Sequence, residues 1–200
     1  MGGVQNIINL MNLPIYNQVE KFVIDSFNKI NKSEEIKHFL RTVYWLKELK
    51  PDTDEALLTA AVSHDIERAF RQKDMDDKKT AVGFAGVEYY KTHELRGAEI
   101  VVDFLKKQNV QNDFIERVSM LISQHEEGGN DDQNLLKDAD CISFFENNVS
   151  FFVSGSELTA SSVKKVKHKL DWMFDKITSE QAEQIAKPFY EDAIKVLNNN

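Results

Sequence analysis

Hydrophobic residues recur at helical spacing along most of this chain, and the breaks between the runs fall at residues that begin or end helices. Pro14 suits the first turn of a helix, and Pro51 stops a later run. Ser33, which two acidic residues follow, is typical of a helix N-terminal cap. The pattern predicts helices over residues 14–31, 36–49, 53–70, 83–107, 111–124, 134–145, 158–176 and 179–197.

These elements predict an all-α fold, and a composition of 13 Phe against 8 Gly and 3 Pro agrees with it. The 200 residues fit a single domain, residues 1–200. We expect the charged residues 72–79 to form a solvated loop and the helix after them to be interrupted near Thr92. Four of the five histidines precede Asn147, so a C-terminal helical cover at about residues 147–200 is expected to follow a histidine-bearing core.

Charge and cysteine content exclude several classes of protein. A net charge of -8 argues against a broad cationic face for nucleic acid, which needs clustered Lys and Arg. Cys141 is the only cysteine, so any metal must use nitrogen and oxygen ligands, and a reducing compartment is favoured. No run approaches the roughly 20 apolar residues of a membrane span, and the first residues lack the charged-then-apolar pattern of a signal peptide, so neither segment is expected. We expect a soluble, cytoplasmic protein with no membrane partner.

A histidine and an aspartate stand side by side at the end of a small, apolar run, Ala60-Ala61-Val62-Ser63-His64-Asp65. Burying such a pair is costly, and a metal ion is the usual compensation. Neighbouring helical residues diverge by about 100°, so both face inward only at the edge of a buried face. Taken alone, the pair is better interpreted as a surface Asp next to a core His than as two buried metal ligands.

The other histidines change this balance, because they also lie on apolar helical faces. His38 shares a face with Thr42 and Trp45, His93 shares one with Gly97, and His125 ends an apolar stripe. One buried histidine is common, whereas four on four different helices are not. Convergence on one shared site is the simpler interpretation.

Two positions in the second half of the chain remain open at this level. His168 lies in a basic run, residues 163–169, which we expect to be a solvated helix face. The alternative is that this run folds over the core and attracts an anionic substrate. Asp140 borders an apolar stripe, whereas Asp138 is expected to point elsewhere and to tolerate replacement by Asn. Periodicity separates these two carboxylates only weakly.

The order of these residues resembles the HD-domain superfamily of metal-dependent phosphohydrolases, in which a His, a His-Asp pair and a distant Asp follow one another. Here they are His38, His64-Asp65 and Asp140, the last preceded by Ala as in that family. His93 and His125 resemble the two additional histidines of HD proteins that hold two metals. The resemblance covers roughly residues 20–146, which makes this segment the expected catalytic core.

The resemblance implies an HD-domain helical bundle with a C-terminal helical extension. It implies two divalent ions, Mn, Fe, Zn or Mg, with Asp65 bridging them: His38, His64 and Asp140 on one ion and His93 and His125 on the other. Metal-activated water would then attack a phosphate ester, with a nucleotide or another small phosphorylated metabolite as substrate. Arg68 and Arg96 each lie three residues beyond an expected ligand and are candidate phosphate clamps or, equally, surface ion-pairing residues.

The sequence departs from the motifs of some HD subfamilies at two points, and two functions other than phosphate ester hydrolysis remain open. Arg68 stands where stringent-response hydrolases and HD-type nucleotidases carry Glu, with Glu67 one step earlier, and no Gly-Tyr-Pro signature of cyclic-di-nucleotide phosphodiesterases is present. Mixed-valent di-iron oxygenases of HD fold share the same ligand order, so the residues do not separate hydrolysis from oxygen chemistry. A non-catalytic module that binds metal or nucleotide is the other alternative. The sequence does not indicate an oligomeric state.

Overall fold

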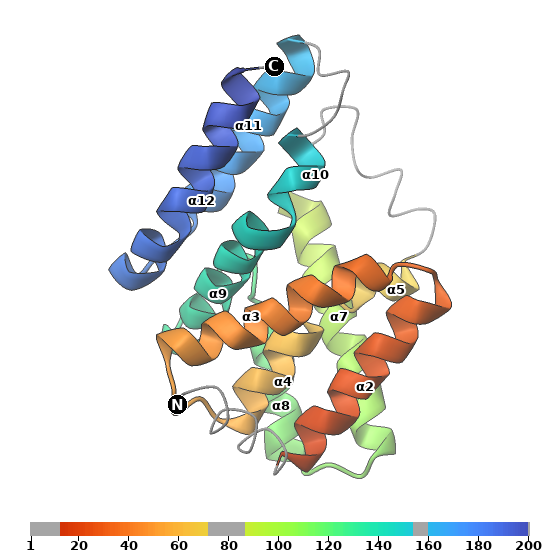
Figure 1. Ribbon diagram of the computed structural model, residues 1–200. Coiled ribbons are helices and arrows are strands. Elements are labelled where there is room, and N and C mark those ends of the chain that lie inside the picture. Colours follow the sequence, from red (N-terminus) through yellow and green to blue (C-terminus); the bar gives the residue numbers. More distant parts are fainter. Residues whose placement is uncertain (1–12, 72–86, 154–159, 200) are drawn as a thin grey trace, which may run out of the picture.

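A computed structural model describes residues 13–71, 87–153 and 160–199, and every regular element in these parts is helical (Figure 1). The expected loop at 72–79 and the first residues of the helices expected from 83 and 158 lie outside them. The described elements are α2 (Pro14–Lys29), a 3-10 turn η1 (Ser33–Glu35), α3 (Ile36–Leu49), α4 (Glu55–Ser63), α5 (Glu67–Phe70), α7 (Val87–Lys107), α8 (Asn112–Ile122), α9 (Asp131–Asn147), α10 (Val149–Val153), α11 (Ala160–Asp175) and α12 (Glu180–Asn198).

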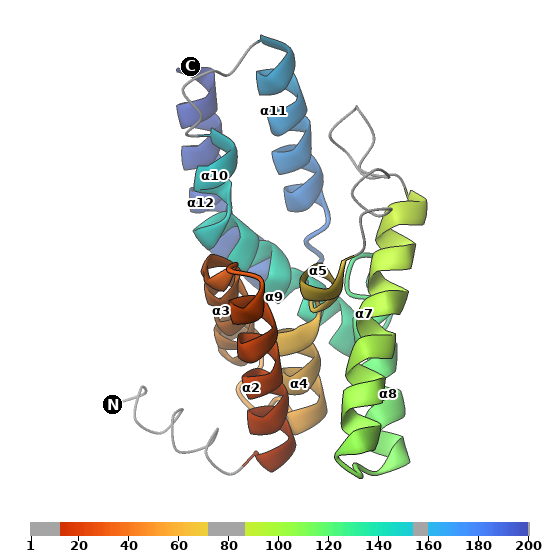
Figure 2. The ribbon, with the colours of Figure 1, turned by 90° about the vertical axis from the view of Figure 1, so that its right-hand side faces the viewer.

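The helices form a bundle with a paired extension. α3 packs along α9, α2 along α4, and α7 beside α8, while α11 and α12 lie next to each other and α12 also contacts α9 (Figures 1 and 2). No helix in the described ranges is long and apolar enough to cross a membrane.

Two clusters of buried apolar side chains stabilise this arrangement. The first joins α2, α3, α4, α7 and α8 to α9 as far as Ala139, and it includes Phe27, Phe39 and Leu46. The second begins at Cys141 on the same helix and continues through α10, α11 and α12. The transition falls inside α9, so one continuous helix contributes to both clusters. A division into core and cover near Asn147 stays a prediction.

Local signals explain where several helices begin, and two expectations are wrong. Asn130 and Gln133 form a capping box at the start of α9, and the Ser179 hydroxyl caps α12. Ser33 does not cap α3 with its side chain; it opens the short 3-10 turn instead. α7 runs through Thr92 without interruption, because its buried face continues on both sides of this residue, with Tyr89 before it and Ala98 and Val101 after it.

The helix expected over 53–70 is broken at His64, and this break shapes the site. α4 ends at Ser63, α5 begins at Glu67, and the turn between them closes with bonds of the i to i+3 type, from Ile66 N to Ser63 O at 3.0 Å and from Arg68 N to Asp65 O at 3.0 Å. A tightened turn changes the angle between consecutive side chains. His64 and Asp65 are accordingly both buried, at 0% and 2% exposure.

Candidate metal centre

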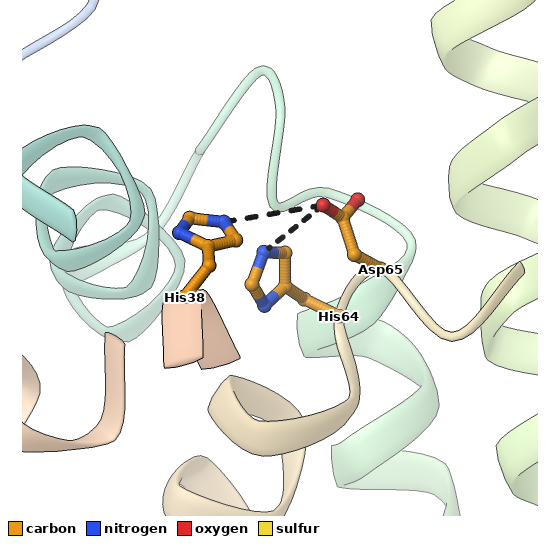
Figure 3. A group of neighbouring side chains, drawn as sticks. All are labelled: His38, His64 and Asp65. Atoms are coloured by element: carbon orange, nitrogen blue, oxygen red, sulfur yellow. Dashed lines mark ion pairs between the residues drawn. The ribbon is translucent and has the colours of Figure 1, made fainter. Parts of the chain in front are cut away.

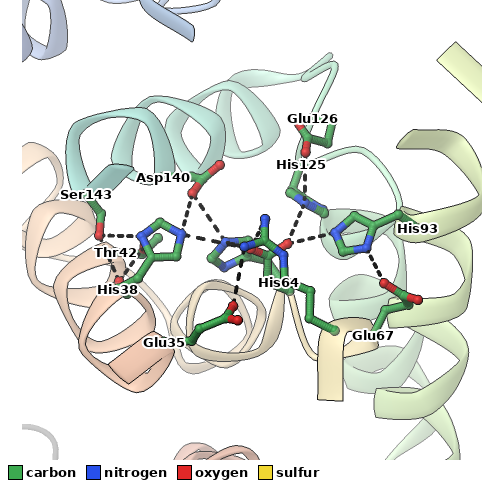
Figure 4. A network of polar contacts seen from close by, with 12 residues as sticks. Glu35, His38, Thr42, His64, Glu67, His93, His125, Glu126, Asp140 and Ser143 are labelled. Carbon is green, nitrogen blue, oxygen red and sulfur yellow. Dashed lines mark hydrogen bonds and ion pairs between the residues drawn. The ribbon is translucent and has the colours of Figure 1, made fainter. Parts of the chain in front are cut away.

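The structure brings all six residues expected in the site into one buried cluster, and none is more than 6% exposed. They come from five parts of the fold that are distant in sequence (Figure 4). His38 lies on α3, His93 on α7 and Asp140 on α9, while the other three lie in the turns that follow α4 and α8: His64, Asp65 and His125.

The Asp65 carboxylate lies between two pairs of histidines. Its Oδ2 atom is 3.6 Å from His64 Nε2 and 4.0 Å from His38 Nε2 (Figure 3). Its Oδ1 atom is 2.7 Å from His93 Nε2 and 3.8 Å from His125 Nε2. Each oxygen therefore faces a different pair of imidazoles, which is the arrangement that a bridging carboxylate requires.

Asp140 completes the first of these groups. Its Oδ1 atom lies 3.0 Å from His38 Nε2 and 3.3 Å from His64 Nε2. Two donors that bind one ion at about 2.1 Å lie about 3.0–3.4 Å from each other, so these separations suit ligands of a common ion. That His38, His64 and Asp140 bind one ion stays a prediction, with which these distances are compatible.

Backbone carbonyls orient two of the imidazoles. His64 Nδ1 lies 2.9 Å from Ala61 O, and His125 Nδ1 lies 2.7 Å from Ile122 O. A carbonyl only accepts, so Nδ1 carries a proton in both rings, and Nε2 is the nitrogen that faces the site.

The proton positions on His38 follow from its partner Ser143. The Ser143 hydroxyl donates to His38 O at 2.8 Å and therefore accepts from His38 Nδ1, also at 2.8 Å. Nε2 is therefore again the nitrogen that faces the site. Ser143 lies one helical turn after Asp140 on α9, so a single helix face supplies a candidate ligand and a residue that orients another.

Glu67 has the same orienting function for His93. Its Oε2 atom lies 2.8 Å from His93 Nδ1, and the Arg71 side chain donates to the same carboxylate. Burial would raise the pKa of Glu67, but the His93 and Arg71 hydrogen bonds outweigh it and lower that pKa to about 2. A carboxylate bound to the outer nitrogen of a histidine is typical of metal-ligating histidines.

The donor types of the site suit metal ions, and an unsatisfied buried nitrogen atom gives a second reason to expect a cation there. The Nε2 atom of His125 is fully buried and has no hydrogen-bond partner. Leaving such an atom unsatisfied costs free energy, which a bound cation would offset. His38, His64 and Asp65 form one compact group of possible ligands, and Asp65, His93 and His125 form another. The buried His/Asp groups can hold a metal.

The charges of the cluster favour ionised carboxylates. Burial would raise the pKa of Asp65 and Asp140, but Arg68 beside the former and His64 beside the latter hold both pKa values well below their usual range. Burial would lower the pKa of His64, but Asp65 and Asp140 outweigh it and raise this pKa to about 9. At His125, burial and the nearby His64 charge lower the pKa to about 4.

The two candidate arginines differ in what the structure places beside them. Arg68 Nη2 lies 2.7 Å from Asp65 Oδ2, and Nη1 lies 3.5 Å from Glu35 Oε2, with the side chain about one-third exposed. Arg68 is thus part of the site. Arg96 is partly buried on α7, and its expected contact with phosphate stays a prediction.

Sequence reasoning missed the residues that support the centre. Glu67 and Ser143 were not expected there, although each lies close in sequence to an expected ligand. Asp138 does point away from the cluster as expected, but it is 1% exposed and accepts four hydrogen bonds from Thr178 and Ser179. Asp138→Asn is therefore expected to destabilise the fold, in contrast to the tolerance expected from the sequence.

The basic run at residues 163–169 is only partly solvent-exposed, whereas the whole run was expected to be solvated. His168 is exposed, as are Lys164 and Lys167. Lys169, in contrast, is half-buried, and its ammonium group lies 4.4 Å from the centre of the Trp172 ring.

A solved protein shares this architecture. It is described as a predicted HD superfamily hydrolase from an uncultured Thermotogales bacterium, and it matches with a TM-score of 0.54 and 18% identity over 92% of this chain and 89% of its own. The chain therefore has the HD-type fold, and the expected all-α HD bundle with its C-terminal helices is confirmed.

At the level of sequence, residues 20–197 match the family described as Domain of unknown function (DUF4202), and the chain belongs to this family. No curated protein matches it. The family's description names no activity, so the chemistry must be argued from the site.

Proposed function

We propose that this protein is a metal-dependent phosphohydrolase that holds two divalent ions. The observation that carries the proposal is the position of Asp65, whose two oxygens face two separate pairs of buried histidines. A bridging carboxylate between nitrogen-rich ligand sets is suited to a pair of transition-metal ions. The proposed ligands are His38, His64, Asp65, His93, His125 and Asp140, and the proposed ions are Mn, Fe, Zn or Mg.

The bound ions would supply Lewis acidity, which ionises water near neutral pH and offsets charge on a phosphoryl group. The protein's own residues position and stabilise the reacting groups. Asp65 and Asp140 are ionised, as metal ligands must be, and Glu67 and Ser143 hold the imidazoles of His93 and His38 in place.

Arg68 is the proposed phosphate-binding residue of the site. Its guanidinium group contacts Asp65 Oδ2, so it lies beside the position proposed for the ions, where a phosphoryl oxygen would bind. Guanidinium groups bind phosphate oxygens in pairs, which orients the group for in-line attack. Arg96 is proposed as a second phosphate contact on α7.

The proposed substrate is a small phosphate ester, such as a nucleotide or another phosphorylated metabolite. A net charge of -8 disfavours a long nucleic acid, whose backbone needs an extended basic surface. A small anion needs only the local positive charge of Arg68 and the ions.

The decisive experiment separates hydrolysis from oxygen chemistry with the same ligands. Protein freed of metal and reloaded with Mn²⁺ is offered a panel of phosphate monoesters, diesters and nucleotides under anaerobic conditions. We expect release of phosphate or cleavage of an ester from at least one of them, because hydrolysis needs only a Lewis acid. Metal-free protein is the control.

A different outcome would contradict the proposal. Activity that requires iron and O₂ and coincides with an electron-spin signal of a coupled Fe²⁺/Fe³⁺ pair would establish the oxygenase alternative. Stable metal loading without turnover on any substrate would favour the non-catalytic module.

A further inference from the structure

The helix α11, outside the expected catalytic core, places cationic and aromatic side chains against elements of the site. Trp172 stacks on Tyr90 of α7 with their ring centres 5.2 Å apart, and Tyr90 lies three residues before His93. Lys176, just after α11, forms a buried ion pair with Glu126, the residue that follows His125. These contacts fix the end of α11 beside the metal cluster.

Lys169 lies within this arrangement. Its ammonium group is 4.4 Å from the Trp172 ring centre and 5.7 Å from those of Tyr90 and Phe144. These three rings belong to α11, α7 and α9, so they hold the ammonium group between three helices. Cation–π contacts of this kind position a lysine strongly, since each ring restricts a different direction.

The charges that act on Lys169 are those of the site. They are the carboxylates of Glu126 and Asp140 and the cations Lys176 and Arg68. Burial and the two neighbouring cations lower the pKa of Lys169 to about 8, although Glu126 opposes this. A negative charge near Lys169 favours its charged form, as Glu126 does, and a phosphate group bound beside it would act in the same direction.

We propose that Lys169 binds the substrate together with Arg68, and that α11 is therefore part of the active site. This inference rests on the proposed function and extends it to a substrate class. Arg68 contacts Asp65 at 2.7 Å, and the charges that act on Lys169 include those of Arg68 and Asp140, so both cations lie close enough to the proposed ions to meet a phosphoryl group there. A terminal phosphate carries close to two negative charges at neutral pH, which suits two cations better than an internal diester does. The substrate class is a phosphate monoester.

Calorimetric titration of the Mn²⁺-loaded protein with inorganic phosphate measures the contribution of Lys169 to anion binding in the absence of turnover. We expect Lys169→Met to weaken phosphate binding by about tenfold or more, because a hydrogen bond between two charged groups is lost while the apolar stem still fills its place. Lys164→Met removes the same charge from an exposed position on the same helix, and it should bind phosphate as the unmodified protein does.

Two further measurements separate binding from structure. Metal content and thermal unfolding should be similar in Lys169→Met, Lys164→Met and the parent, whereas Lys169→Arg, which keeps the charge, should recover most of the affinity. The parent should also bind phenyl phosphate more tightly than diphenyl phosphate, and Lys169→Met should reduce this preference.

The outcomes for the two proposals are distinguishable. Lys169-dependent phosphate binding without ester hydrolysis would support the anion site and contradict the proposed catalysis. Hydrolysis with phosphate binding that is equal in Lys169→Met and the parent would overturn the Lys169 proposal alone. Absence of phosphate binding by the parent, or failure of Lys169→Arg to recover it, would overturn it as well.

Discussion

Asp65→Ala is expected to empty both metal positions at once. Among the residues that the structure describes, Asp65 is the carboxylate whose two oxygens face both histidine pairs, at 2.7–4.0 Å from four imidazole nitrogens, so its loss removes a ligand from each ion. The substitution also leaves the Arg68 charge beside the cluster, where it repels cations. Loss of a residue that hydrogen-bonds to a metal ligand typically lowers metal affinity or activity by about 10–100-fold. Loss of the shared ligand itself should lower turnover by more than about 100-fold.

Metal content by atomic emission and turnover on the best substrate from the panel measure this effect. Asp103→Ala on α7 is the matched control, because Asp103 is exposed and the same carboxylate is removed. The control should keep both metal and activity. Retention of a full metal load by Asp65→Ala would show that Asp65 is not the shared ligand.

The second large effect is a contrast between two neighbouring carboxylates on α9. Asp140→Asn is expected to abolish metal-dependent turnover with little loss of folding, because Asp140 Oδ1 faces His38 and His64. Asp138→Asn should keep metal binding but lower the free energy of unfolding by about 2–4 kcal/mol, because charge-assisted hydrogen bonds are lost and an amide donor is turned toward other donors.

The structural reason is that Asp138 fixes the start of α12. Its two oxygens accept from the backbone nitrogens and hydroxyls of Thr178 and Ser179 at 2.6–3.0 Å. Urea unfolding and metal analysis of both variants test the contrast. If Asp138→Asn lost metal and Asp140→Asn kept it, the ligand on α9 would be Asp138.

Much of the fold was predictable because helical periodicity is a local property. The helix expected over 36–49 has the bounds of α3, and the capped starts of α4 and α12 carry Asp54 and Ser179, as helix starts usually do. The break at His64 was not predictable, because no Gly or Pro marks it and Ile66 and Ala69 continue the helical spacing of apolar residues beyond it. The break depends on contacts that periodicity does not report, such as the bond from His64 Nδ1 to Ala61 O.

The site was predictable to the extent that its members share a recognisable order and lie on apolar faces. The residues that support them come from contacts between distant helices: Ser143 is 105 positions from His38, and Glu67 is 26 positions from His93. Lys169 was assigned to a solvated run because its neighbours Lys167 and His168 are basic. Only the packing of α11 separates it from them.

The most direct test of the binuclear centre is the number of ions bound per chain. Protein purified without chelators, and then reloaded with excess Mn²⁺ and freed of unbound metal, should contain close to two ions per chain, because Asp65 presents one oxygen to each of two histidine pairs. His93→Ala and His125→Ala should each lower this number toward one. A value of one ion per chain in the parent protein that persists after reloading would contradict the two-ion centre.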